Sequence, residues 1–141
     1  MVTLEVWYDQ EPENDFGPGD PALVVSTPAE LDELIDRILA ETAEHVAPPM
    51  IQVAIAGVKR SPVLEVGLGQ DKGFIGYISR TEGGATHGDG DPNTLVDYIY
   101  MSNHSQVPAS TEVPMDTVRR GLHEFLATGK RPSVVHTDGA S

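Results

Sequence analysis

The feature that most constrains the fold is a run of three strand candidates joined by very short connections. The candidates are Met50–Ala56, Pro62–Leu68 and Phe74–Arg80, and the connections are Gly57–Arg60 and Gly69–Gly73. Connections this short join antiparallel neighbours only, because a parallel pair needs a much longer crossover. The middle of the chain therefore predicts an antiparallel sheet.

Four more segments predict strands. Val2–Tyr8 begins with alternating polarity, so that Glu5 and Trp7 face away from Leu4 and Val6. The others are Leu23–Ser26 as a short edge strand, Thr94–Met101 as a fourth strand of the central group, and Ser133–Thr137 as a short last strand. Two polar segments predict a loop and a connection, Thr81–Asn93 and Asn103–Glu112.

Two amphipathic patterns predict helices. Thr27 is a good N-cap for the first, Pro28 suits its first position, and Glu30 completes a capping box. The second begins near Pro114, and Gly129 suits its C-terminal end. Apolar residues recur at helical spacing in both: Leu31, Leu34, Ile35, Ile38 and Leu39 in the first, and Val118, Leu122, Phe125 and Leu126 in the second.

The order strand, helix, several strands, helix, strand predicts an α+β fold. We expect a mainly antiparallel sheet of about five to six strands with two helices packed on one face. The 141 residues correspond to a single domain, residues 1–141. Within it we expect an exposed acidic loop at residues 10–21 and a flexible tail at residues 138–141.

Charge is the main clue to function. The chain has 9 Lys and Arg against 22 Asp and Glu, which gives a formal net charge of −13. Residues 1–45 hold 12 of the acidic residues and one basic residue, Arg37. A field of this sign repels nucleic acid and anionic membranes and attracts basic partners. The alternative is that the acidity only keeps the protein soluble.

Sequence signals for metals, cofactors and membranes are weak. The absence of Cys excludes disulfides, thiol catalysis and Cys-ligated zinc. Gly67–Gly73 looks like a phosphate loop, which needs a strand before it and a helix after it. Here a strand candidate lies on each side, so the segment is better explained as a turn. Asp89–Asn93 resembles half of a calcium loop, but Thr94 and Tyr100 stand where that loop needs Gly and Glu. We therefore expect no cofactor, no metal, no membrane segment and a cytoplasmic location.

The histidines leave a small-molecule-binding or enzymatic site open as an alternative function. His87 and His104 are predicted to lie on loops beside the sheet, and Asp89 lies near His87 in the sequence. A general base could come from this group, but the same residues can be combined into triads in many ways. A third alternative is a scaffold or dimerisation module that uses the strand face of Tyr98 and Tyr100.

Four stretches of the chain resemble the first-numbered family in the Imm series of bacterial immunity proteins, found beside polymorphic toxins. They are Thr27–Asp36, Leu64–Gly73, Val113–Arg120 and Glu124–Pro132, and the last two are the most specific. The expected last strand, Ser133–Thr137, lacks the Trp that members of the family usually carry.

The resemblance implies a small α+β cytoplasmic protein that performs no catalysis. Members of the family bind and neutralise a toxin domain, often a nucleic-acid deaminase, that is delivered between competing bacteria. The resemblance therefore implies a basic toxin domain as the partner of this chain. A deaminase acting on nucleic acid needs a basic groove for phosphates and a pocket for the extruded base. Carboxylates of an acidic inhibitor can occupy the places of those phosphates.

We expect the contact with such a partner to come mainly from acidic residues of the first helix and of the loop before it. The helix contributes Asp32, Glu33 and Asp36, and the loop contributes Glu11, Glu13, Asp15 and Phe16. Tyr98 and Tyr100 share a strand face and could anchor the contact. The alternatives are a solvated helix face and a flexible loop for the acidic segments, and core packing for the tyrosines.

Overall fold

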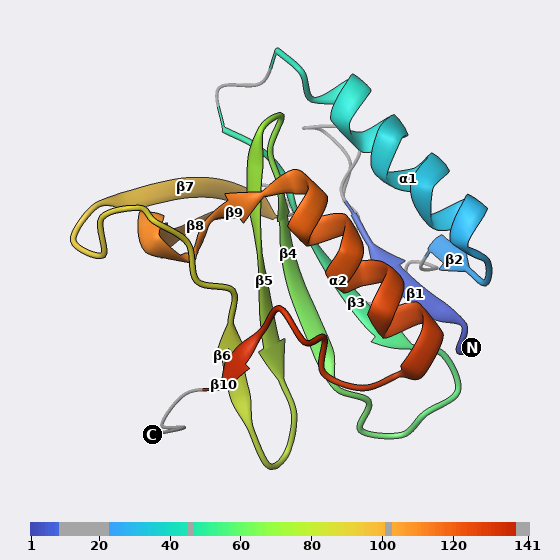
Figure 1. The fold of residues 1–141 in the computed structure, drawn as a ribbon. Helices are drawn as coiled ribbons and strands as arrows, with labels where there is room; N and C mark the ends of the chain where they lie inside the picture. Colours follow the sequence, from blue (N-terminus) through green and yellow to red (C-terminus); the bar gives the residue numbers. More distant parts are fainter. Residues whose placement is uncertain (9–22, 45–46, 101–102, 138–141) are drawn as a thin grey trace.

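The computed structural model describes residues 1–8, 23–44, 47–100 and 103–137. The acidic loop expected at residues 10–21 and the tail expected at residues 138–141 lie outside the described residues. Within the described part, a large sheet and two helices form the body of the molecule (Figure 1). None of the described helices is long and apolar enough to cross a membrane.

All strand pairs of the main sheet are antiparallel, as the short connections predict. Its strands are β1 Leu4–Trp7, β2 Leu23–Val25, β3 Met50–Ile55, β4 Val63–Leu68, β5 Lys72–Ile78, β6 Gly83–Ala85, β9 Val113–Pro114 and β10 His136–Thr137. They run in the order β10-β6-β5-β4-β3-β1-β2, and β9 pairs with β5 beside this path. The predicted α+β class and the predicted order of the central hairpins are confirmed.

Both predicted helices are present, α1 at Pro28–Glu41 and α2 at Met115–Thr128 (Figure 1). At the start of α1, the Glu30 amide donates a hydrogen bond to the Thr27 hydroxyl, and the Thr27 amide donates one to the Glu30 carboxylate. These two bonds form the predicted capping box. α2 is followed by Gly129, whose φ of 69° is a left-handed conformation that favours glycine.

The helices and one face of the main sheet enclose the main core. The apolar stripes of both helices are buried together with the strand residues that point toward them. Members of this core include Leu31, Ile35 and Ile38 of α1, Val118, Leu122 and Phe125 of α2, and Leu4, Val53, Val66 and Ile75 of the sheet. Successive strand residues point to opposite faces, so intervening residues such as Glu5 and Glu65 point away from the helices.

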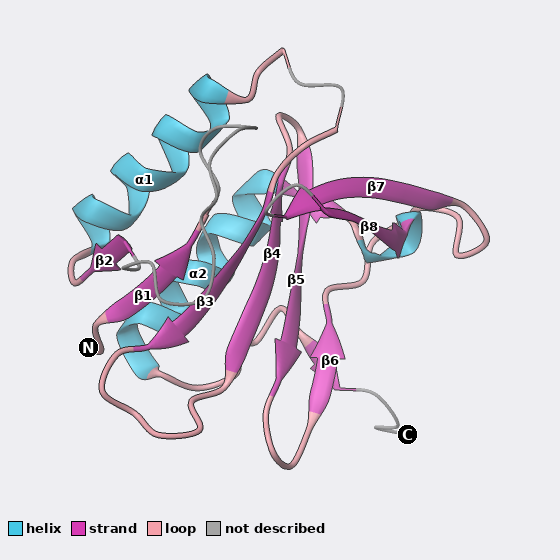
Figure 2. Cartoon of the chain, turned by 180° about the vertical axis from the view of Figure 1, so that it is seen from behind, coloured by secondary structure: helices cyan, strands magenta, loops and turns pink. Residues whose placement is uncertain are grey.

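A second sheet of two strands packs on the opposite face. β7, Leu95–Tyr100, pairs with β8, Asn103–Pro108. Seen from behind in Figure 2, the pair crosses one end of the main sheet and extends beyond it. Tyr98 of β7 meets Phe74 of β5 edge-on, with 4.9 Å between the ring centroids, and Met50 of β3 completes this second buried cluster.

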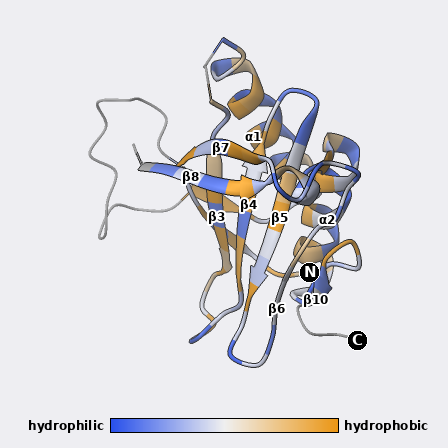
Figure 3. Cartoon of the chain, turned by 90° about the vertical axis from the view of Figure 1, so that its left-hand side faces the viewer, coloured by the Kyte–Doolittle hydropathy of each residue, from blue (hydrophilic) through white to orange (hydrophobic). Residues whose placement is uncertain are grey.

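The prediction for the segment from Thr94 to Glu112 is therefore wrong in two respects. Thr94–Met101 contains a strand, but this strand does not extend the central group, because Tyr98 packs over the face of the main sheet. Asn103–Glu112, expected to be a connection, contains β8 and a short 3-10 helix at Ala109–Thr111. Figure 3 shows β8 mostly in the hydrophilic colour, which explains why its residues resemble a loop in the sequence.

Two further boundaries differ from the prediction. β6 lies inside the expected loop Thr81–Asn93, because pairing with β5 forms it from Gly83, Gly84 and Ala85, which carry almost no side-chain signal. The last strand is shorter than expected and contains only the two residues of β10, which pair with β6. Strands held by backbone pairing alone cannot be recognised from polarity patterns.

Gly67 of β4 allows the small sheet to approach the main sheet closely. A Cβ atom at this position would lie 2.5 Å from the rings of both Phe74 and Tyr98. Gly76 of β5 points to the same face, but a Cβ atom there would lie 3.8 Å from the nearest atom of the neighbouring strand, the backbone oxygen of Glu65. The packing of the small sheet therefore depends on the missing side chain at residue 67.

We predict that Gly67→Ala lowers the free energy of unfolding by about 1–3 kcal/mol, because the added methyl group forces two packed rings apart. Urea unfolding of the purified protein measures this change. The control is Gly76→Ala, for which we expect a change within about 0.5 kcal/mol. Equal losses in the two variants would contradict the role assigned to Gly67.

Candidate protein-binding surfaces

Two of the acidic helix residues predicted to contact a partner are paired within the molecule. Arg119 of α2 lies between Asp32 and Asp36 of α1. Its Nη1 donates a hydrogen bond to Asp32 Oδ1 at 3.2 Å, and its Nη2 donates one to Asp36 Oδ1. His123, one turn further along α2, places its Nε2 2.9 Å from the same oxygen of Asp32. The two helices are therefore joined by charged groups as well as by the core.

These contacts change the acidity of Asp32. The hydrogen bond with His123 is the largest cause that holds the pKa of Asp32 below its ordinary value of 3.8; Arg119 acts in the same direction, and desolvation opposes both. A lowered pKa in the folded state means that the carboxylate stabilises the fold above its ordinary pKa. This stabilisation is lost as the pH falls through the folded-state pKa. It is modest, because the Asp32 side chain is 48% exposed and solvent screens the pair.

Glu33, the third acidic residue predicted on this helix, is exposed and has no ion pair among the described residues. It borders a cavity of about 300 Å³ between α1 and β2. The cavity is lined by apolar residues and by a few charged ones: Leu23, Val24, Val25, Leu34, Glu30, Glu33 and Arg37. Two carboxylates and one guanidinium give its rim a net negative charge.

Tyr98 is a core residue and not an exposed anchor. Its side chain is 0% exposed, and its hydroxyl donates a hydrogen bond to Glu112 Oε2 at 2.6 Å. Burial raises the pKa of Tyr98, and the Glu112 carboxylate raises it further, so the hydroxyl stays protonated and remains a donor. The core-packing alternative therefore holds for Tyr98.

The side chain of Tyr100 lies outside the described part, as do all four loop residues predicted to contact the partner: Glu11, Glu13, Asp15 and Phe16.

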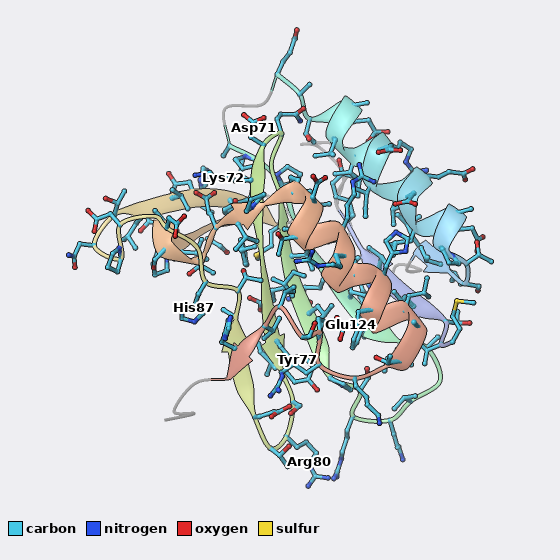
Figure 4. The ribbon with its side chains drawn as sticks, in the orientation of Figure 1. Asp71, Lys72, Tyr77, Arg80, His87 and Glu124 are labelled. Atoms are coloured by element: carbon cyan, nitrogen blue, oxygen red, sulfur yellow. The ribbon has the colours of Figure 1, made fainter. Side chains whose placement is uncertain are left out.

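The described contacts do not join His87, Asp89 and His104, the residues of the alternative site. His87 lies at the edge of the sheet (Figure 4), where its ring meets that of His136 edge-on with 5.3 Å between centroids. His104 lies on β8, paired with Ile99 of β7. Among the described residues, no group of three or more His, Asp or Glu could hold a metal ion. The contacts of His87 and His104 therefore do not support a shared catalytic or metal site with Asp89.

Beside the small sheet, no described helix or strand covers the face of the main sheet that lies opposite the helices (Figure 2). Paired residues of antiparallel strands point to the same face, so the strand register defines rows of side chains across it. One row is Trp7, Gln52, Glu65, Gly76, Ala85 and His136; the other is Val24, Glu5, Ala54, Val63, Ile78 and Gly83. All of them are exposed or half-buried. We call these two rows the open face.

The open face combines exposed apolar groups with negative charge. Val24 and Ile78 are 60% and 53% exposed, and Trp7 is the only tryptophan of the chain. The open face has two carboxylates, those of Glu5 and Glu65, and neither has an ion pair in the described part of the molecule. Neither row of the open face contains Lys or Arg. Large aromatic and apolar side chains are the usual anchors of protein interfaces.

Sequence reasoning identified only part of the open face. The alternation at the start of the chain predicts that Glu5 and Trp7 point away from Leu4 and Val6, and the structure confirms this. Which strands lie beside them, and whether another element covers them, depends on long-range packing. Glu65 in particular could be placed only from the pairing of β4 with β3 and β5.

We predict that Asp32→Asn lowers the free energy of unfolding at neutral pH by about 0.5–1 kcal/mol, because it removes the charge that Arg119 and His123 contact. The difference from the parent protein should shrink as the pH falls below 3.8, where the parent begins to lose the same charge. Urea unfolding over this pH range measures it. Glu33→Gln is the control, with an expected change under about 0.5 kcal/mol. A difference that does not vary with pH would rule out the ion-pair explanation.

Comparison with known proteins identifies the family of the chain. The family model described as Immunity protein Imm1 matches residues 19–138, which include every described helix and strand except β1. A search of curated proteins found no match. Imm immunity proteins are inhibitors without catalytic activity, and the partner of each is a cognate toxin. The chain therefore belongs to the Imm1 family of immunity proteins, and its function is to neutralise a toxin.

Proposed function

We propose that this immunity protein neutralises its toxin by presenting carboxylates to a basic cleft in which the toxin binds nucleic acid. The observation that carries the proposal is the net charge of −13, most of which lies in residues 1–45. A protein that binds nucleic acid gathers Lys and Arg where the phosphates lie. An inhibitor of opposite charge competes for the same cations and excludes the substrate while the complex lasts.

The toxin class that we propose is a nucleic-acid deaminase, inhibited in the cytoplasm where its substrate lies. Such an enzyme holds the phosphate backbone and draws one base into a pocket. Its active site therefore combines a basic groove with a narrow cavity. An acidic protein can close the groove without entering the cavity, so it needs no reactive residue of its own. The resemblance to immunity proteins that often oppose deaminases supports this choice.

Among the helix acids, Glu33 is the one that we assign to the long-range attraction of the toxin. Its carboxylate is exposed and has no ion pair among the described residues, whereas Asp32 and Asp36 share the guanidinium of Arg119. A carboxylate already paired with a cation attracts a partner less strongly than a free one. The loop residues predicted from the sequence stay predictions.

Charge and buried contacts act on different rates in this proposal. Attraction between opposite charges raises the association rate, whereas buried contacts determine how slowly the complex dissociates. A stable interface buries about 800 Å² on each partner. The complex therefore needs an apolar contact in addition to the attraction between charges.

The deaminase proposal predicts a particular outcome of co-expression. The toxin domain encoded beside the gene of this protein should stop growth, and co-expression of this protein should restore it. Nucleic acid from poisoned cells should carry cytosine or adenine deamination products, and these should disappear in protected cells.

A plasmid with an early stop codon in the immunity gene is the control for this experiment. Strand breaks without base changes would overturn the deaminase assignment but leave toxin neutralisation intact. Failure to protect would overturn the pairing of these two proteins.

We predict that Glu33→Lys lowers the association rate with the toxin about three- to tenfold at low salt, and that the difference fades as ionic strength rises. Stopped-flow mixing with a catalytically inactive toxin measures the rate. The control is Asp71→Lys, the same charge change in the β4–β5 turn (Figure 4), where the side chain is exposed. Equal slowing by the two variants would indicate that net charge alone matters and not the position of Glu33.

A further inference from the structure

We propose that the toxin docks on the open face of the main sheet, with Trp7 as an anchor and with Glu5 and Glu65 as acceptors for its basic side chains. This proposal rests on the toxin-neutralising function and names the surface that performs it. It does not require the toxin to be a deaminase.

The exposure of apolar residues on the open face is the first argument. The other face of the same sheet is covered by both helices, and one end of this face is covered by the small sheet. Beside that end, Ala54 and Val63 lie in one row with the exposed side chains of Val24 and Ile78. Apolar side chains that gather on an exposed face of a protein mark an interaction site.

The width of the open face across its strands suits one protein partner. Each row crosses six strands, and six strands at a spacing of about 4.8 Å span roughly 24 Å. A standard contact of about 800 Å² is roughly 28 Å on each side. The two rows therefore provide the middle of such a contact, and the small sheet borders it at one end (Figures 2 and 3).

Charge selects a basic partner for this surface. The rows contain two glutamates and no Lys or Arg, and neither Glu5 nor Glu65 has an ion pair among the described residues. The nearby cations Lys59, Arg60 and Arg80 lie in the β3–β4 and β5–β6 turns, outside the rows, and Figure 4 shows Arg80 at the tip of its hairpin.

The same charges argue against two other occupants. A second copy of this chain would bring its own glutamates to the glutamates of the first, and the rows of neither copy contain Lys or Arg. Residues 9–22 of the chain offer no complement either, because they contain acidic residues and no Lys or Arg. A toxin with a basic nucleic-acid groove supplies the cations that both of these occupants lack.

Trp7 and Glu5 together fit an arginine of the toxin. They lie two residues apart on β1 and point to the same face, so the indole ring and the carboxylate are neighbours. A guanidinium can stack on an indole ring and donate hydrogen bonds to a carboxylate at the same time. Both residues precede residue 19, where the match to the Imm1 family begins. This part of the surface therefore lies outside the matched family pattern.

A matched pair of variants tests the docking surface. Ile78→Asp changes the open face, and Leu95→Asp makes the same change on β7; the two parent side chains are 53% and 57% exposed. Titration calorimetry with a catalytically inactive toxin should show at least tenfold weaker binding for Ile78→Asp and less than a twofold change for Leu95→Asp. Glu65→Lys should also weaken binding at least tenfold, and urea unfolding checks that each variant is folded.

Trp7 provides an independent readout, because it is the only tryptophan of the chain. The protein labelled with 5-fluorotryptophan should give one fluorine resonance, which should shift when the unlabelled toxin binds. An unchanged resonance, or normal binding by folded Ile78→Asp and Glu65→Lys, would overturn the docking surface while toxin binding by the parent protein stands.

Two further outcomes separate the docking surface from the function. Failure of the parent protein to bind or neutralise the toxin would overturn the pairing of these two proteins as well. A dimer of the free protein that Ile78→Asp dissociates, measured by light scattering, would show that a second copy occupies the open face and would overturn the toxin assignment for this surface.

Discussion

The alternation of side chains along β3, β4 and β5 is the constraint on which the rest of the structure depends. It places Val53, Val66 and Ile75 on one face as an apolar layer that must be covered. Both helices pack against that layer. The small sheet covers one end of the opposite face, where Phe74 and Tyr98 meet over Gly67. Among the described residues, no element covers the open face, so the pattern that builds the core also exposes the surface proposed for the partner.

The parts of the fold that could be predicted are those with local signals. The capping box at Thr27 and Glu30, the apolar stripes and Gly129 define both helices, and the short turns define the central hairpins. β6 could not be predicted, because glycines and an alanine leave no polarity pattern. The position of β7 depends on the contact of Tyr98 with Phe74, residues that are distant in the sequence, and no local pattern reports such a contact.

The candidate site shows the same division between local and long-range information. The sequence shows that the chain is acidic, but it does not show which carboxylates are free. Asp32 meets Arg119 and His123 only because α1 and α2 pack side by side, whereas Glu33 on the same helix remains exposed. The outward direction of Glu5 and Trp7 follows from alternation along the strand. Their proposed role in binding a partner also requires that no other described element covers them. Composition therefore predicts the kind of partner, and tertiary packing decides which residues can meet it.

The separation of inward and outward positions on β1 has a consequence for how this protein can evolve. A substitution at Glu5 or Trp7 changes the surface offered to a partner, while Leu4 and Val6 continue to fill the core. When the cognate toxin changes, the matching change in this protein can occur at outward positions at little cost to folding. Recognition can thus diverge between lineages on an architecture that stays the same.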